Sequence, residues 1–110
     1  MPRKTPDLLH GTLDLLILKT LAGEPLHGWA LARRIQSVSH DVLEVNQGSL
    51  YPALYRLEDE DLIKGDWQES DEGRKVKVYR LTSGGRGELA RETKEWRRFS
   101  GAVNLVLATE

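Results

Sequence analysis

Hydrophobic residues recur every three or four positions in the first part of the chain, which is the period of amphipathic helices. The first such stretch predicts a helix over about 12–22, beyond the helix-breaking Pro6 and before Gly23, a common residue type at helix ends. A second stretch predicts a helix over 28–38. Its apolar face contains Leu31, Ala32, Ile35 and Val38.

A third helix is predicted after a polar segment, although a proline lies near its start. Its apolar positions keep the helical spacing at Leu50, Ala53, Leu54 and Leu57. Asn46 and Ser49 are both good helix caps, and Pro52 is compatible with a helix only in the first turn, so we expect a start near Ser49. We expect the end at 59–61, where an aspartate can adopt the left-handed conformation usual for glycine.

Two β-compatible stretches follow this helix and predict a hairpin. The strands span about 62–67 and 75–82, and 70–73 has the composition of a turn. In the second strand, alternation places Val76 and Val78 on one side and Lys77, Tyr79 and Leu81 on the other. Neither face is purely apolar, so one of them is expected to be wet or to meet a polyanion. Tyr79 and Leu81 are expected to brace the hairpin.

The chain ends in a long amphipathic pattern. Thr82 is a suitable cap for a last helix, while Gly84, Gly85 and Gly87 weaken its first turns and predict a delayed start. A helix of about 25 residues has an apolar stripe too long for a core of this size to cover, and two-fold dimers are the commonest way to bury one. We therefore expect dimerisation through Leu89, Thr93, Trp96, Phe99, Val103, Val106 and Leu107.

This order of elements predicts an α+β fold that is mostly α. Three helices followed by a two-stranded hairpin are typical of a winged helix-turn-helix, in which the third helix enters the major groove of DNA and the hairpin, or wing, lies on the backbone. We expect residues 1–82 to form the winged-helix DNA-binding domain and 83–110 to form a C-terminal dimerisation helix, together one compact unit.

The composition fits one folded domain and disfavours several kinds of site. The chain has 110 residues, of which 39% are hydrophobic and 30% charged. It contains no cysteine, and His10, His27 and His40 lack metal-ligand spacing, so we expect no disulfide, metal or cofactor. The longest apolar run is too short and too charged to span a membrane, and the N-terminus lacks a signal-peptide core. The expected location is the cytoplasm, at the nucleoid.

The net charge of −1 conceals an uneven distribution of charge. Residues 57–73 contain eight acidic residues and one basic residue, whereas 74–80 contain four basic residues and no acid. A charge run alone is commonly a solvated face. On a wing, however, such a patch can bind phosphates, and a DNA footprint requires only a local patch. The candidate phosphate contacts there are Arg74, Lys75 and Lys77.

The amino end of the third helix contains residue types that contact DNA. Short amides and hydroxyls hydrogen-bond to base edges or phosphates, and glycine permits close approach of the backbone. The candidates are Asn46, Gln47, Gly48 and Ser49. Further along, Tyr51 and Arg56 are suited to contacts with phosphates. Alternatives remain open, because Asn46 and Ser49 can simply cap the helix and the Tyr51 ring can pack on the second helix.

Five segments of the chain resemble the PadR family of bacterial transcriptional regulators. They lie at 11–18, 27–30, 43–54, 56–58 and 77–82, and the most specific is Gly48-Ser49-Leu50-Tyr51-Pro52-Ala53-Leu54. The resemblance implies a winged helix, a C-terminal helix that dimerises, and repression from a roughly palindromic operator. The length fits the short branch of the family, with one helix after the wing. By resemblance, the recognition motif comprises Asn46, Gly48, Ser49, Tyr51 and Pro52, and the basic wing comprises Arg74 and Lys77.

The chain departs from the usual family pattern at three positions. Trp29 stands where tyrosine is usual, Asp61 where glycine is usual, and Val78 where many relatives have a second tyrosine, which leaves the contacts of the wing open. The resemblance also makes Trp96 a candidate contact for a small, flat hydrophobic effector held between two subunits. The alternative is that Trp96 only packs in the dimer core. Trp67 is interpreted as packing in the wing or the core.

Together these features predict a sequence-specific DNA-binding regulator. We expect a homodimeric repressor on a double-stranded DNA operator, with release by a small hydrophobic effector as a further possibility. An enzyme is disfavoured, because the chain lacks cysteine, a glycine-rich phosphate loop and a Ser–His signature. The main alternative is a winged-helix adaptor that binds proteins and not DNA, since the acidic stretch before the wing would repel DNA that it faced.

Overall fold

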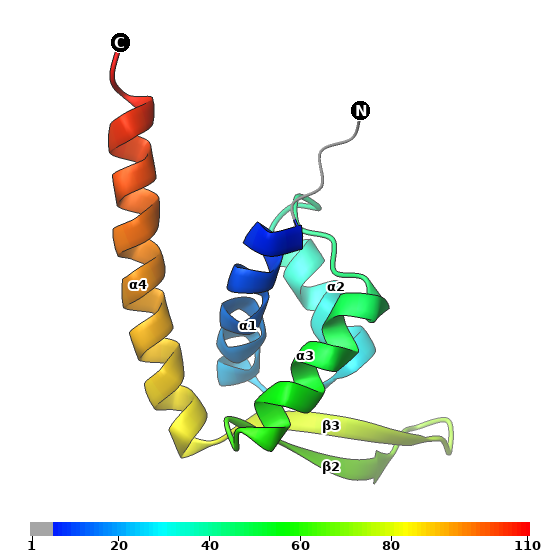
Figure 1. The fold of residues 1–110 in the computed structure, drawn as a ribbon. Coiled ribbons are helices and arrows are strands. Elements are labelled where there is room, and N and C mark those ends of the chain that lie inside the picture. The colour runs from blue at the N-terminus through cyan, green and yellow to red at the C-terminus, as the bar shows by residue number, and fades with distance from the viewer. Residues whose placement is uncertain (1–5) are drawn as a thin grey trace.

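Three helices pack together above a small sheet, and a fourth helix rises from the end of the sheet (Figure 1). The computed structural model describes residues 6–110, with side chains from residue 12 onward. Its elements are α1 (Pro6–Gly23), β1 (Leu26–His27), α2 (Gly28–Val38), α3 (Gln47–Asp59), β2 (Ile63–Glu69), β3 (Lys75–Leu81) and α4 (Ser83–Leu107). The predicted order of helices, hairpin and long helix is confirmed, with one additional strand.

The first three helices follow the hydrophobic period, with differences at their ends. The predicted start of α1 near residue 12 was wrong. The helix begins at Pro6, because proline suits the first turn, where its missing N–H removes no helical bond. α2 has the predicted bounds. α3 begins at Gln47, slightly earlier than expected, with Asn46 as its N-cap. As predicted, it ends shortly before an aspartate in the left-handed conformation, Asp61, with a φ of 60°.

The sheet has three antiparallel strands in the order β1-β3-β2, so the prediction of two strands was incomplete. The hairpin is present, with β2 and β3 paired along their whole length and Gly73 at a φ of 80° in the turn. β1 escaped prediction because two residues are too few to show a period. It pairs with Val78 and Tyr79 and so joins the wing to the start of α2.

The core lies between the three helices and the inner face of the sheet. Tyr79 and Leu81 of β3 are buried in it and brace the root of the wing, as predicted. Val38, predicted on the apolar face of α2, is instead 71% exposed. The other core residues come from the apolar faces of the first three helices and from β2: Leu13, Ile17, Leu18, Leu21, Leu31, Ile35, Leu50, Ala53, Leu54, Leu57 and Ile63.

α4 begins directly after the sheet, so the delay predicted from its glycines was wrong. Thr82 Oγ1 accepts a hydrogen bond from the N–H of Gly85 (2.9 Å) and donates one to the carbonyl of Asp61 (2.7 Å), which caps the helix. A Cβ at Gly85 would clash with the carbonyl oxygen of Leu62. The glycine therefore allows close packing of α4 on the sheet, and this packing outweighs its poor helix propensity.

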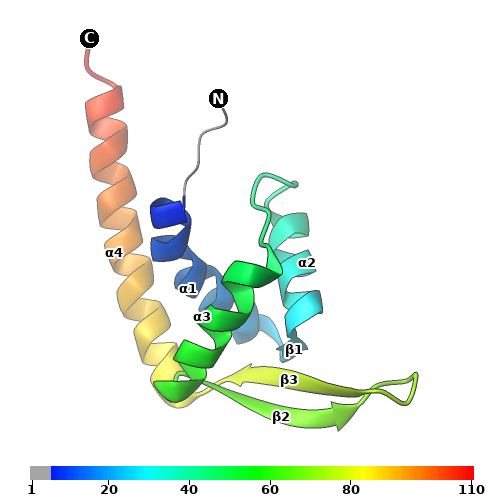
Figure 2. The ribbon, with the colours of Figure 1, turned by 45° about the vertical axis from the view of Figure 1, so that its right-hand side comes forward.

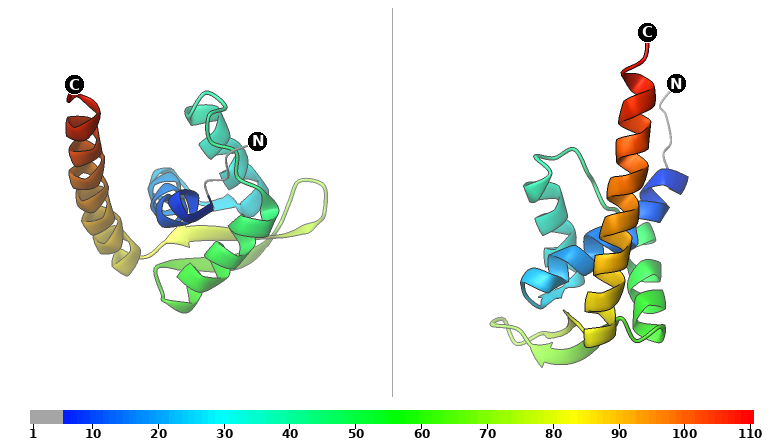
Figure 3. Two further views of the ribbon diagram at one scale, coloured as in Figure 1. Left: turned by 45° about the horizontal axis from the view of Figure 1, so that its top comes forward. Right: turned by 90° about the vertical axis from the view of Figure 1, so that its left-hand side faces the viewer.

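The first half of α4 packs against α1, and the second half extends beyond the other helices and the sheet (Figures 1 and 3). Leu89 and Thr93, on the inner face of the first half, are partly buried. Every residue from 101 to 110 is exposed. The extension lengthens the molecule to 58 × 35 × 21 Å. None of the described side chains, from residue 12 onward, covers the apolar residues of this second half.

Candidate nucleic-acid interface

The amino end of α3 lies on the surface with its polar residues accessible. Asn46, Gln47 and Gly48 are exposed and Ser49 is partly buried. The Asn46 Oδ1 accepts a hydrogen bond from the N–H of Ser49 (2.9 Å), which confirms the capping interpretation of Asn46. The cap uses only the oxygen, so the Asn46 amide nitrogen keeps its donors for a ligand. Capping and DNA contact are therefore compatible.

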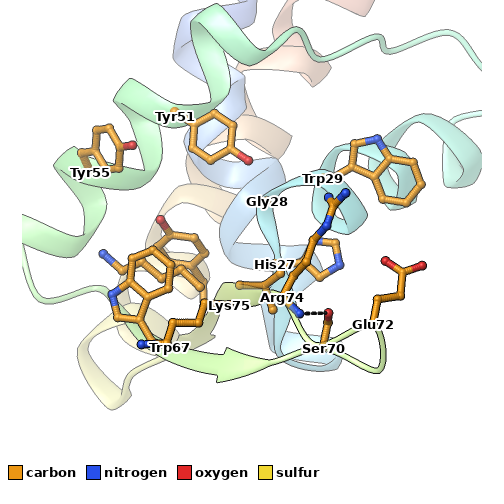
Figure 4. Close-up of a pocket in the computed structure, with 13 residues that line it drawn as sticks. His27, Gly28, Trp29, Tyr51, Tyr55, Trp67, Ser70, Glu72, Arg74 and Lys75 are labelled. Atoms are coloured by element: carbon orange, nitrogen blue, oxygen red, sulfur yellow. Dashed lines mark hydrogen bonds between the residues drawn. The ribbon is translucent and has the colours of Figure 1, made fainter.

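Tyr51, on the second turn of α3, packs over the amino end of α2. A Cβ at Gly28 would lie 2.7 Å from the Tyr51 hydroxyl oxygen, so the glycine makes room for the ring. The ring centroid is 6.2 Å from that of Tyr55, one turn further along. Tyr51 thus has the predicted packing role on α2, while its hydroxyl points into the space below α3 (Figure 4).

A groove of about 720 Å³ lies between the wing, α3 and the amino end of α2. The wing forms its floor, because the hairpin projects beneath both helices (Figure 2). Tyr51 and Tyr55 line it from α3, Trp29 from α2 and Trp67 from β2 (Figure 4). The groove is thus bordered by large aromatic rings from three elements.

The basic residues of the wing reach this groove. Arg74 rises from the end of the hairpin toward Trp29, and Lys75 lies beside it (Figure 4). Both are exposed, and the N–H of Arg74 donates to Ser70 Oγ (3.2 Å), which orders the turn. Among the side chains that line the groove, Glu72 is the acidic one, whereas Arg74, Lys75 and Lys77 are basic. Basic residues therefore outnumber acidic ones in the groove. Part of the patch predicted from the sequence therefore lies in the same groove as Tyr51 and Tyr55 of α3 and the amino end of α2.

Lys77 also lines the groove, but its ammonium group is bound to an acid. It donates a hydrogen bond to Glu58 Oε1 of α3 (2.9 Å), and this bond raises the pKa of Lys77 above its usual value. Glu58 Oε2 also accepts the N–H of Gly65 on β2 (3.2 Å). Lys77 therefore ties the wing to α3, a contact that its position in the sequence did not suggest.

Arg56 has an intramolecular partner as well. Its guanidinium donates two hydrogen bonds to Asp14 of α1, from Nη1 to Oδ2 (2.8 Å) and from Nη2 to Oδ1 (2.7 Å). These bonds raise the pKa of Arg56 above its already high normal value. Arg56 does not line the groove described above. Its contact with phosphate stays a prediction. In the structure, its charge is paired with Asp14.

Sequence reasoning missed the two exposed tryptophans beside the groove. Trp67 is 68% exposed on β2, so the interpretation of core packing was wrong and its place is the wing. Trp29 is 56% exposed; its ring stacks on His27 (6.3 Å), and the Arg33 guanidinium lies 4.9 Å from its centroid. Large exposed aromatics commonly mark interaction surfaces. Their position became evident only when the fold brought α2 and β2 together.

The residues predicted for dimerisation follow one side of α4. Trp96 and Phe99 are 38% and 55% exposed, with ring centroids 6.1 Å apart. Leu89 and Thr93 are partly buried, and the other members of the stripe, Val103, Val106 and Leu107, are exposed.

Two further observations concern metal ions and membranes in the part of the chain that the structure describes. Among residues 12–110, whose side chains the structure describes, no three His, Cys, Asp or Glu residues are grouped so as to hold a metal ion. Within the same range, no helix is both long and apolar enough to cross a membrane.

Comparisons with known proteins identify similar sequences and folds. The profile of the family described as "Transcriptional regulator PadR-like family" matches residues 17–91. A transcriptional regulator of Mycobacterium tuberculosis is 36% identical over 80 residues, which are 73% of this chain and 71% of that protein.

Solved structures with a similar fold include a PadR-like transcriptional regulator of Bacillus cereus. It is 32% identical, with a TM-score of 0.80 over 94% of this chain and 99% of that one. A PadR family transcriptional regulator of Eggerthella lenta is 30% identical, with a TM-score of 0.78 over 96% and 89% of the two chains. The similarity therefore extends over nearly the whole chain.

Proposed function

The chain belongs to the PadR-like family of transcriptional regulators, and we propose that it is a repressor that binds a roughly palindromic DNA operator as a homodimer. It is a transcriptional regulator and not an enzyme, as the sequence predicted. Acting on the chromosome, it would work in the cytoplasm at the nucleoid.

The observation that best supports DNA binding is the groove between the wing and α3. Arg74 and Lys75 are exposed on the wing side, and Asn46 and Gln47 are exposed at the amino end of α3. A winged helix places its recognition helix in the major groove and its wing on the backbone. We therefore assign Gln47 and Asn46 to base edges and the two wing cations to phosphates of the adjacent strand.

The aromatic lining fits the same ligand. A sugar-phosphate backbone presents the apolar faces of deoxyriboses between its phosphates, and exposed aromatic rings can pack on them. Trp29 and Trp67 lie on opposite borders of the groove that would hold that strand (Figure 4). The Tyr51 hydroxyl can donate to a phosphate from above. Tyr51 was already among the contacts expected from the sequence, and Trp29 and Trp67 extend that set.

Dimerisation through α4 is the second part of the proposal. The outer half of α4 exposes Phe99, Val103 and Val106, and α1 is apolar on nearly all sides, with Leu15 and Leu16 only partly covered. A helix that is apolar all round is normally buried. A second copy of the chain, related by a two-fold axis, would cover both surfaces and present two copies of α3 to successive major grooves. In this proposal 83–110 form the main dimerisation element, with α1 as a second contact, and 1–82 form the DNA-binding domain.

The acidic stretch does not oppose this assignment. Glu58 is neutralised by Lys77, and Asp59, Glu60 and Asp61 follow at the carboxyl end of α3, opposite the end assigned to the bases. The adaptor alternative predicts that the acidic stretch repels DNA, whereas the proposed orientation keeps most of it outside the groove.

Equilibrium binding to double-stranded DNA tests the function. The purified protein should bind a labelled duplex, and its affinity should fall steeply as salt rises, because each neutralised phosphate releases counterions. Fluorescence anisotropy between 50 and 300 mM potassium chloride measures this. A protein that fails to bind any duplex at 50 mM, including the DNA upstream of its own gene, would be an adaptor.

A small hydrophobic effector held at Trp96 is a separate element of the proposal. The chain has three tryptophans, so replacing Trp29 and Trp67 by phenylalanine leaves Trp96 as the single source of tryptophan emission. Flat hydrophobic compounds that release DNA should then quench its emission in the dimer. Release of DNA without any change in Trp96 emission would exclude this site.

A further inference from the structure

The ion pair between Asp14 and Arg56 links two helices that are distant in the sequence. Each terminal guanidinium nitrogen donates to one carboxylate oxygen, Nη1 to Oδ2 at 2.8 Å and Nη2 to Oδ1 at 2.7 Å. A planar fork of this kind fixes orientation as well as distance. The Asp14 side chain is 19% exposed and that of Arg56 is 48% exposed, so the pair is partly shielded from solvent. It fastens the carboxyl half of α3 to α1.

The other end of α3 is the end assigned to the bases. Gln47 lies nine residues from Arg56, so at 1.5 Å per residue the two are about 13 Å apart along the axis. A rotation of α3 by about 10° around Arg56 would displace Gln47 by about 2 Å, whereas a functional site requires placement within about 0.5 Å. A small rotation of α3 at the ion pair therefore produces a large displacement of the residues assigned to the bases.

The same ion pair lies next to the helix proposed to dimerise. α1 packs against α4, and the Glu92 carboxyl of α4 is close enough to Asp14 and Arg56 to interact with both charges. Glu92 is hydrogen-bonded to Glu88, whose carboxylate is paired with Arg91. Charges from α1, α3 and α4 thus meet at one junction between the recognition helix and the dimer helix.

We propose that Arg56 is a positioning residue, whose ion pair with Asp14 sets the orientation of α3 relative to α4 and thereby the spacing of the two recognition helices in the dimer. Both effects rest on the dimer proposed above and the effect on DNA also rests on the proposed DNA binding, while the effect on the dimer can be measured without DNA. This role takes the place of the phosphate contact expected from the sequence. It assigns Asp14 a part in operator choice although Asp14 lies on α1, outside the recognition helix.

A distance measurement in the free dimer tests the geometry. Because the chain has no cysteine, Gln47→Cys places one spin label per subunit at the exposed amino end of α3. Pulsed electron paramagnetic resonance should give a narrow distance distribution in the parent protein. We expect a broader or shifted distribution in Arg56→Ala and in Asp14→Ala, and recovery of the narrow one in the exchanged pair Asp14→Arg with Arg56→Asp.

Further variants guard against a trivial loss of structure. Arg56→Lys keeps the positive charge but cannot form the two parallel hydrogen bonds of the guanidinium. It should therefore fold and give a distance distribution of intermediate width. Circular dichroism checks that each labelled variant is folded. A distribution in Arg56→Lys and folded Arg56→Ala that matches the parent would overturn the proposal, whether or not the protein binds DNA.

The DNA readout separates positioning from direct contact. Operators whose half-site spacing differs by one base pair should be distinguished at least 10-fold by the parent protein and less than 3-fold by Arg56→Ala, with an unchanged salt slope. If Arg56 instead contacts one phosphate per subunit, the slope of log K against log salt falls by about 1.8 per dimer and the spacing preference remains. That second result would overturn the positioning role.

Discussion

Removing the two wing cations, Arg74 and Lys75, should weaken DNA binding through the loss of phosphate contacts. Arg74 and Lys75 are exposed and line the groove, and neither side chain has a partner among the residues the structure describes. A dimer would therefore bring four such cations to phosphates. With about 0.9 counterions released per phosphate, Arg74→Ala combined with Lys75→Ala should reduce the slope of log K against log salt by about 3.6.

The same slope sets the loss of affinity. If the variant and the parent have equal binding constants at 1 M salt, the variant binds duplex about 10³- to 10⁴-fold more weakly at 0.1 M. The loss should be similar on all sequences, because phosphates lack sequence information. Anisotropy titrations of parent and variant on one operator and one unrelated duplex, over the same salt series, measure both quantities.

A matched control removes two charges from the other end of the same hairpin. Lys64 and Arg80 are exposed, directly opposed in the register, and outside the groove. Replacing both by alanine should leave the slope within 1 of the parent value, since about 0.9 is the effect of a single contact. An unchanged slope in the wing variant, or an equal reduction in the control, would refute the assignment of phosphates to the groove.

Three further predictions concern packing, protonation and assembly. Gly85→Ala should destabilise the fold by about 1–3 kcal/mol, because the added Cβ clashes with a backbone carbonyl. Gly87→Ala places its Cβ in open space and should raise stability by up to about 1 kcal/mol. Thermal unfolding measures both, and equal effects of the two substitutions would contradict this prediction. Burial, Glu88 and Asp14 raise the folded-state pKa of Glu92 to about 7. Because the folded state holds this proton more tightly than the unfolded chain, its stabilising effect is lost as pH rises from about 4.3 to about 7. Glu92→Gln should therefore exceed the parent in stability at pH 8 by about 1 kcal/mol, after allowance for exposure, and by less at pH 5; a difference independent of pH would refute it. Phe99→Glu with Val103→Glu should yield a folded monomer in sedimentation, and a persistent dimer would exclude the outer half of α4 as the interface.

The helices and the hairpin were predictable because each shows its own period over enough residues. α2 illustrates this best, since its apolar positions gave its bounds correctly. β1 could not be predicted, because a two-residue strand exists only through its pairing with β3. The start of α4 was misjudged because propensity alone penalises Gly85, whereas its close contact with the backbone at Leu62 requires it.

The candidate site was predictable only in its local parts. The cap at Asn46 and the basic run beginning at Arg74 are visible in the sequence because they depend on neighbouring residues. The partners of Arg56 and Lys77 are not, since Asp14 and Glu58 lie 42 and 19 residues away. An exposed cation and one already paired look alike in a sequence, and only the fold separates them.

A hydroxyl-radical footprint on the DNA upstream of the protein's own gene, or on a site selected from a random library, would show whether the protein binds DNA as a two-fold dimer. A symmetric dimer predicts two related protected regions of inverted sequence, centred about one helical turn (10–10.5 base pairs) or a multiple of it apart. We also expect Gln47→Ala to alter which base pairs are preferred within each region. A single protected region without symmetry, or no protection at low salt, would contradict the account of a two-fold DNA-binding dimer.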